Sequence, residues 1–146
     1  MAQLRATTTL HVEPDTLWRD IGHFGDVGKW YPSLENLESD GEFVGARRVF
    51  ETKFAGEQTE RLQALDPETR RYSYVIESTG LPVTHCTAEL RVDDNGDGSS
   101  TLVWSAEFDA HGDDSAVEML ERFFEDGVAG LRKRYSADAD AHAAAE

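Results

Sequence analysis

The chain has 146 residues, 39% of them hydrophobic, and its 29 acidic and 14 basic side chains give a formal net charge of −15. This length suits a single domain that buries a core without a metal ion, and the lone cysteine excludes an internal disulfide. The excess of negative charge excludes nucleic-acid binding through a basic patch and disfavours adsorption to anionic membranes.

The first third of the chain predicts one strand followed by two short helices. Residues 4–13 are rich in threonine and alternate in polarity, as a half-buried strand does. Pro14 then suits the first turn of a helix, and apolar residues follow with helical spacing until Gly22. A second short helix or turn is expected at residues 25–32.

Six strand candidates follow, each bounded by a turn signal. They cover residues 34–40, 46–53, 58–65, 71–78, 84–93 and 100–110. Short strands at such regular intervals are typical of an antiparallel meander.

The last segment predicts one long helix. Ser115 and Glu118 have the spacing of a capping box. The apolar stripe behind them consists of Val117, Leu120, Phe124, Val128, Leu131 and Tyr135. About six turns are expected, near 30 Å in length. Residues 137–146 carry no core side chains and are expected to form a disordered tail after a single domain of residues 1–136.

These elements together predict an α+β fold in which a curved antiparallel sheet surrounds the long C-terminal helix. The meander must bury one face, and the apolar stripe of the helix is suited to cover it. The space between sheet and helix is therefore the candidate binding site.

Turn chemistry predicts the register of the hairpins. A three-residue turn at "FAG" pairs Lys53 with Glu57, Phe50 with Glu60 and Arg48 with Leu62. A five-residue loop at "DPETR" pairs Leu62 with Tyr74, Glu60 with Ile76 and Ala64 with Tyr72. The inward face then comprises Arg48, Phe50, Thr52, Glu60, Leu62, Ala64, Tyr72, Tyr74, Ile76, Cys86, Ala88, Leu90, Val92, Leu102, Trp104, Ala106 and Phe108.

Arg48 and Glu60 are the two charged residues on this apolar face. An isolated buried ion costs several kcal/mol, so the two must be paired, hydrated or used. One interpretation is a structural ion pair at the mouth of the cavity. The other is a ligand site in which Arg48 holds an anionic or carbonyl oxygen and Glu60 acts as a base or acceptor.

Six segments between about residues 3 and 135 carry a family resemblance: "PDTLWRDIGHFGDVGKWYP", "GARRVF", "ERLQALDPETRRYSYVI", "LPVTHCTAEL", "TLVWSAEFDA" and "GLRKRY". They resemble the SRPBCC superfamily of START and birch-pollen-allergen-like proteins, in its bacterial polyketide cyclase/dehydratase-like branch. The resemblance implies a helix-grip fold of about seven strands with an internal hydrophobic cavity. It also places the recurring motif of this branch at residues 30–32, Arg48, residues 60–62 and Trp104. Relatives often have an aromatic residue where this chain has Cys86, which implies a wider cavity there.

The predicted ligand is a hydrophobic or aromatic molecule that bears one or two oxygens. The residues expected to line its site are Trp30, Phe50, Leu62, Tyr72, Tyr74, Ile76, Cys86, Trp104, Phe108, Phe124 and Val128. In an enzyme of cyclase/dehydratase type, Glu60 would remove an acidic α-proton while Arg48 and Tyr74 stabilise the enolate, without a cofactor. A non-catalytic carrier or sensor needs only the cavity. A protein-interaction module would use the acidic surface instead, and the sequence leaves these three classes open.

Other signals favour structural explanations. The loop "DDNGDG" begins like a calcium loop, but Trp104 stands where the twelfth-position glutamate is required. The histidines lack ligand spacing, so no metal site is expected. Gly127 and Gly130 in the long helix predict clearance for a sheet side chain or a ligand, with a helix kink as the alternative. Without a long apolar run, we expect a cytoplasmic protein without membrane insertion, as a monomer or homodimer.

Overall fold

The computed structural model describes residues 2–53, 56–110 and 115–144, with side chains described through Tyr135. The elements in chain order are β1 (Ala2–Leu10), α1 (Pro14–Ile21), η1 (Phe24–Lys29), β2 (Glu35–Ser39), β3 (Arg47–Thr52), β4 (Gly56–Asp66), β5 (Arg71–Ser78), β6 (Val83–Asp94), β7 (Ser100–Ala110) and α2 (Ser115–Ala144). The seven strands form one antiparallel sheet in the order β1-β7-β6-β5-β4-β3-β2. The predicted helix-grip architecture is therefore confirmed.

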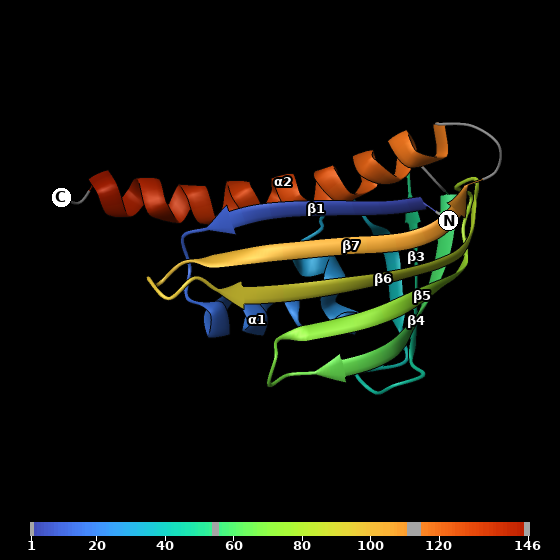
Figure 1. Ribbon diagram of the computed structural model, residues 1–146, viewed down its shortest axis with the longest axis horizontal. Coiled ribbons are helices and arrows are strands. Elements are labelled where there is room, and N and C mark those ends of the chain that lie inside the picture. Colours follow the sequence, from blue (N-terminus) through green and yellow to red (C-terminus); the bar gives the residue numbers. More distant parts are fainter. Residues whose placement is uncertain (1, 54–55, 111–114, 145–146) are drawn as a thin grey trace.

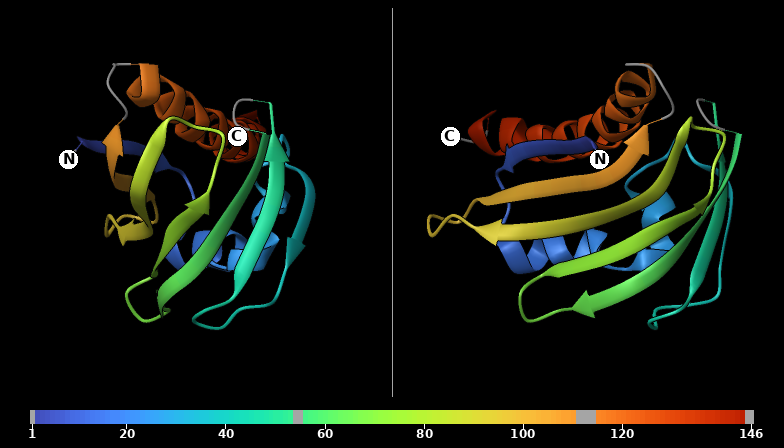
Figure 2. Two further views of the ribbon diagram at one scale, coloured as in Figure 1. Left: turned by 90° about the vertical axis from the view of Figure 1, so that its right-hand side faces the viewer. Right: turned by 45° about the vertical axis from the view of Figure 1, so that its right-hand side comes forward.

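The sheet curves strongly around its interior. The long helix α2 lies along β1 and β7 on one side of the molecule (Figure 1). The short helices α1 and η1 lie on the other side, beneath the bend of the sheet (Figure 2). Irregularities in the strand pairing, between Leu62 and Ala64 and between Thr84 and Thr87, contribute to the bend, because a bulge increases the local twist of a strand. The apolar faces of sheet and helices thus enclose one common core.

The predicted register of β3 and β4 is wrong by two residues. Arg48 pairs with Glu60 directly, rather than with Leu62, and Phe50 pairs with Gln58 rather than with Glu60. The difference arises at the turn, because Gly56 (φ 63°) is the first residue of β4 and not the last residue of the loop. A shift of two residues keeps each side chain on its predicted face, since the side-chain period of a strand is two. Glu57 accordingly pairs with Glu51 and not with Lys53.

The second predicted register is confirmed in part. Leu62 pairs with Tyr74 and Glu60 pairs with Ile76, as expected. The bulge that follows Leu62 then turns Ala64 to the exposed surface opposite Ser73, so its predicted inward position is wrong. Thr52, also predicted inward, is only half-buried.

Helix α2 is longer than the sequence indicates. It begins at Ser115 and extends to Ala144, past the boundary expected at residue 136. The domain boundary and the disordered tail at residues 137–146 stay predictions, because no side chain is described in that stretch. None of the helices in the described ranges combines the length and hydropathy needed to cross a membrane.

Candidate functional site

The opposite charges predicted for the interior form a buried ion pair. Arg48 is 2% exposed and Glu60 is 1% exposed. Nε and Nη2 of Arg48 each lie 2.7 Å from Oε1 of Glu60. Nη1 of Arg48 donates to the backbone carbonyl of Phe24 at 2.8 Å and to the hydroxyl of Tyr72 at 3.4 Å. All three nitrogens of the guanidinium group therefore have acceptors within the protein.

The second oxygen of Glu60 is also engaged, through residues that sequence reasoning missed. Gln58 is fully buried, and its Nε2 donates to Oε2 of Glu60 at 2.6 Å. The hydroxyl of Thr79 donates to Oε1 of Gln58 at 2.7 Å and accepts from the backbone N–H of Leu81 at 3.1 Å. Both carboxylate oxygens therefore have donors, which a free general base does not. The signal for Gln58 was its position, two residues before Glu60 on the same face of one strand.

Aromatic rings surround the guanidinium group. The Cζ atom of Arg48 lies 4.1 Å from the ring centre of Phe24, 4.7 Å from that of Tyr74 and 5.8 Å from that of Tyr72. Cation–π attraction at these distances adds to the ion pair. Burial raises the pKa of Tyr72, although the nearby Arg48 charge opposes the shift. Burial and the Glu60 charge together raise the pKa of Tyr74 well above its usual value, so both phenols are neutral around pH 7.

A second aromatic cluster lies between the sheet and α2. The rings of Trp104 and Phe124 stack with their centres 4.2 Å apart, and Tyr31 lies 5.2 Å from Phe123. The indole N–H of Trp104 donates to the hydroxyl of Tyr74 at 2.9 Å, which joins this cluster to the rings around the ion pair. The hydroxyl of Tyr31 donates to the backbone carbonyl of Phe123 at 2.6 Å. The space predicted to be a cavity is thus occupied by ring side chains.

The indole N–H of Trp30 stands apart from this satisfied network. Trp30 is 3% exposed, and among the buried side-chain polar atoms of the described residues its Nε1 alone has no hydrogen-bond partner. Its ring meets that of Trp104 in a T-shaped arrangement with centres 5.5 Å apart. Ring packing of this kind does not replace a conventional hydrogen bond. A buried donor without an acceptor costs about 1–3 kcal/mol. A hydrogen bond from Nε1 to an acceptor outside the chain would remove this cost.

The glycines of α2 explain how closely the elements approach. A Cβ atom on Gly127 would lie 2.7 Å from the ring of Tyr31 and 2.8 Å from the ring of Trp104. A Cβ atom on Gly130 would lie 3.1 Å from the backbone carbonyl of Trp30. The prediction of clearance for a sheet side chain is confirmed at Gly127, because Trp104 belongs to β7.

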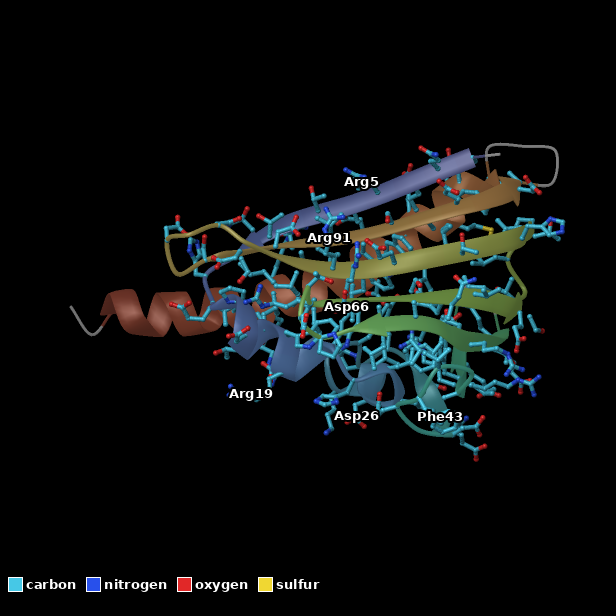
Figure 3. All side chains as sticks on the ribbon, turned by 60° about the horizontal axis from the view of Figure 1, so that its bottom comes forward. Arg5, Arg19, Asp26, Phe43, Asp66 and Arg91 are labelled. Atoms are coloured by element: carbon cyan, nitrogen blue, oxygen red, sulfur yellow. The ribbon has the colours of Figure 1, made fainter. Side chains whose placement is uncertain are left out.

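Two of the surface pockets differ in their relation to the interior. One of about 390 Å³ lies at the edge of the aromatic cluster and is lined by Tyr31, Pro32, Ser33, Leu34, Glu35, Thr52, Lys53 and Asp126. Another, of about 550 Å³, lies on the outer face of the sheet, where Arg5 and Arg91 are seen in Figure 3. Only the first shares a buried residue, Tyr31, with the aromatic cluster. We name it the mouth pocket.

The remaining candidates have structural environments. Burial raises the pKa of the Cys86 thiol to about 12, and the Glu60 charge acts in the same direction, so the thiol is a poor nucleophile. His85 is exposed, and its Nδ1 lies 3.0 Å from the Asp109 carboxylate. Within the described ranges, no three His, Cys, Asp or Glu side chains gather as metal ligands would.

The predicted ligand-site residues all lie in the interior. The buried members are Trp30, Phe50, Leu62, Tyr72, Tyr74, Ile76, Cys86, Trp104, Phe108, Phe124 and Val128. The structure adds Phe24 and Phe123, which the hairpin register could not supply because they lie on η1 and on α2. It also buries Tyr31, which the family resemblance had included in residues 30–32. The role of the predicted ligand-site residues in binding stays a prediction.

Solved structures from several organisms share this fold. The protein XoxI from Bacillus cereus aligns with a TM-score of 0.83 at 22% identity, covering 92% of this chain and 96% of that chain. The Zhui aromatase/cyclase from Streptomyces sp. R1128 aligns with a TM-score of 0.73 at 22% identity, covering 95% and 93%. Norcoclaurine synthase from Thalictrum flavum, in complex with dopamine and hydroxybenzaldehyde, aligns with a TM-score of 0.69 at 18% identity, covering 90% and 84%.

The sequence comparisons agree with the fold. No curated protein sequence matches significantly. Residues 1–136 match the family described as polyketide cyclase/dehydrase and lipid transport. With its seven-stranded sheet closed by α2, the chain therefore belongs to the polyketide cyclase/dehydrase and lipid transport family.

Proposed function

We propose that the protein binds a hydrophobic or aromatic small molecule between the sheet and α2, and that the Trp30 indole N–H holds an oxygen of that molecule. The observation that carries the proposal is the unpartnered Nε1 of Trp30, in a part of the core whose other polar atoms are engaged. An acceptor oxygen of a ligand would supply the missing hydrogen bond. The family and the aromatic surroundings of Trp30 support an apolar ligand.

The mouth pocket is the proposed route to this site. It shares Tyr31 with the aromatic cluster, and Tyr31 packs against both Trp30 and Phe123. A ligand would take the place of ring side chains, so binding requires Tyr31 and Phe123 to change rotamer. The hydrogen bond from Tyr31 to the Phe123 carbonyl would open in the same step. Rearrangement of a few side chains is common on binding and needs little backbone movement.

The geometry around Glu60 favours ligand binding over catalysis in which Glu60 removes a proton. The carboxylate of Glu60 is held by Arg48 and Gln58 through both oxygens, at 2.6–2.7 Å. To act as a base towards an acidic α-proton it would have to release one of these donors within a buried site. We therefore propose a carrier or sensor, in which Arg48 and Glu60 hold the strands together and cyclisation or dehydration is not required.

A protein interface centred on exposed apolar side chains has less support. Phe43 and Val44 are the large hydrophobic side chains exposed in the described part of the chain, and they occupy one loop between β2 and β3. Two adjacent side chains make a smaller patch than a stable interface needs. The expected cytoplasmic location, and a monomeric or homodimeric state, stay predictions.

The first experiment is a thermal-shift screen of aromatic polyketides, sterols and fatty acids. A ligand that binds only the folded protein raises its stability in proportion to the logarithm of its concentration over Kd. Native mass spectrometry of protein from its source is an independent search for a bound molecule. Stabilisation only by highly charged metabolites would contradict an apolar site.

The second experiment tests Trp30 itself. Trp30→Phe keeps a ring but removes the donor, so a ligand with a carbonyl oxygen should bind about fivefold to tenfold more weakly. Its isostere without the oxygen, for instance 2-ethylnaphthalene against 2-acetylnaphthalene, should lose much less. Trp18→Phe, at a half-buried ring on α1, is the matched control. Equal losses for both ligands would show that Trp30 contributes packing and no hydrogen bond.

A further inference from the structure

We infer that the ligand of this site is uncharged, and that the interior discriminates against carboxylates even when their apolar part fits. The inference rests on the proposed function, and it concerns the chemical class of the ligand. It reverses an expectation from the sequence, in which Arg48 was a candidate to hold an anionic oxygen.

The cation that could hold an acid is already neutralised. Arg48 is the one buried Lys or Arg side chain among the described residues. Two of its nitrogens face Oε1 of Glu60, and the third donates to the Phe24 carbonyl and the Tyr72 hydroxyl. A ligand carboxylate that approached Arg48 would also approach Glu60, so attraction and repulsion would largely cancel. The site therefore offers no net positive charge to an acid.

The donors that remain are neutral. The Trp30 indole N–H never carries a charge, and it can satisfy one carbonyl, ether or hydroxyl oxygen. Burial raises the pKa of Tyr31, Tyr72 and Tyr74, which keeps these phenols uncharged as well. One neutral donor suffices for a buried carbonyl, whereas a buried carboxylate needs a counter-charge or several donors. The same interior thus suits a ketone or an ester far better than the corresponding acid.

The mouth pocket acts in the same direction. Its charged side chains are Glu35, Asp126 and Lys53, which leave one excess negative charge at the proposed route. The whole chain carries a formal net charge of −15, so the long-range field also repels anions. Repulsion on approach adds to the cost of burial, and both are absent for a neutral ligand.

The test compares matched pairs of ligands on the wild-type chain. One pair is 2-acetylnaphthalene and 2-naphthoate; a second is methyl dodecanoate and dodecanoate. Titration calorimetry at pH 7.5, with the indole N–H signals followed by NMR, gives the affinity and shows whether Trp30 is contacted. In each pair that binds, the neutral member should bind at least tenfold more tightly, and it alone should shift the Trp30 signal strongly.

The outcomes separate the two claims. An acid that binds as tightly as its neutral partner overturns this inference and leaves the proposed binding function intact. If no member of either pair, and no compound of the thermal-shift screen, binds, the proposed function fails and this inference fails with it.

A variant tests the stated cause. Glu60→Gln keeps the shape of the side chain but leaves Arg48 with an unbalanced charge. Its affinity for 2-naphthoate should rise at least tenfold over that of the wild type, while its affinity for 2-acetylnaphthalene changes less than threefold. A folded variant that still rejects the acid would overturn the assignment to Arg48. Should the variant be too unstable to measure, the comparison on the wild type decides alone.

Discussion

Replacing Arg48 by methionine is expected to destabilise the protein strongly, because it leaves the Glu60 charge without its partner. Glu60 is 1% exposed and would retain only the hydrogen bond from Gln58 as a charge-stabilising contact. Breaking a buried ion pair from one side costs about 3–5 kcal/mol. Methionine fills part of the vacated volume and keeps contact with the rings of Phe24 and Tyr74, so a loss of about 3 kcal/mol in the free energy of unfolding is expected.

The double variant Arg48→Met/Glu60→Met isolates the stranded charge. With both ions removed, the desolvation penalty disappears, and the double variant should be clearly more stable than the single one. Arg47→Met is the matched control, since Arg47 is adjacent on β3 but 53% exposed in its ion pair with Glu77. That control should cost less than about 1 kcal/mol. Urea unfolding followed by fluorescence gives all three values.

The pH dependence supplies a second readout for the single variant. A buried carboxyl group without a partner binds a proton more readily when folded than when unfolded, so unfolding releases protons. The stability of Arg48→Met should therefore rise relative to the wild type as the pH falls from 8 to 5. The reasoning is refuted if Arg48→Met costs less than 1 kcal/mol, or if the double variant is no more stable than Arg48→Met.

Three further predictions follow from the packing and hydrogen bonds of the core. Gly127→Ala should lower the melting temperature, although alanine forms helices more readily than glycine, because the added methyl group would lie within 2.8 Å of the rings of Tyr31 and Trp104. An unchanged or higher Tm would show that these rings move aside freely. Tyr74→Phe should cost about 1–3 kcal/mol in urea unfolding by stranding the Trp104 indole N–H, and Tyr72→Phe, which loses a 3.4 Å contact, should cost less; equal losses would contradict this order. Burial raises the pKa of Tyr31, Tyr72 and Tyr74 above the value in the unfolded chain. The stability that these phenols contribute is therefore complete below about pH 10 and is lost as the pH rises further. Phenolate absorbance that appears well before the protein unfolds would contradict this prediction.

The sequence predicted the face of the sheet on which a strand residue lies more accurately than its partner on the neighbouring strand. The side-chain period of two survives a register error of two, so Arg48 and Glu60 were placed inward although their direct pairing was missed. The error came from one glycine, because Gly56 fits a left-handed turn position and a strand start equally well. The bulge after Leu62 had no signal in the sequence, and so Ala64 was assigned to the wrong face.

The hydrophobic periodicity of the sequence could not predict how the side chains of sheet and helix pack against each other. The long helix and the sheet were both predicted to present aromatic residues, but whether those rings leave a space depends on rotamers and on the distance between elements. That distance is set by Gly127, which lets α2 approach Trp104 and Tyr31. Trp30 was predicted to line the site, whereas the lack of a hydrogen-bond partner for its Nε1 depends on the positions of all surrounding atoms.

β1 is synthesised before the other six strands, but its partner β7 is the last of them to be synthesised. It pairs with β7, which ends at Ala110, and α2 covers it only after that. Tyr31 and Phe123, joined by a hydrogen bond, are 92 residues apart in the sequence. Contacts of such separation form late, because the entropy of closing a long loop opposes them. The nascent domain therefore carries an uncovered apolar sheet face until helix α2 is complete, and exposed apolar surface of this kind is prone to aggregation.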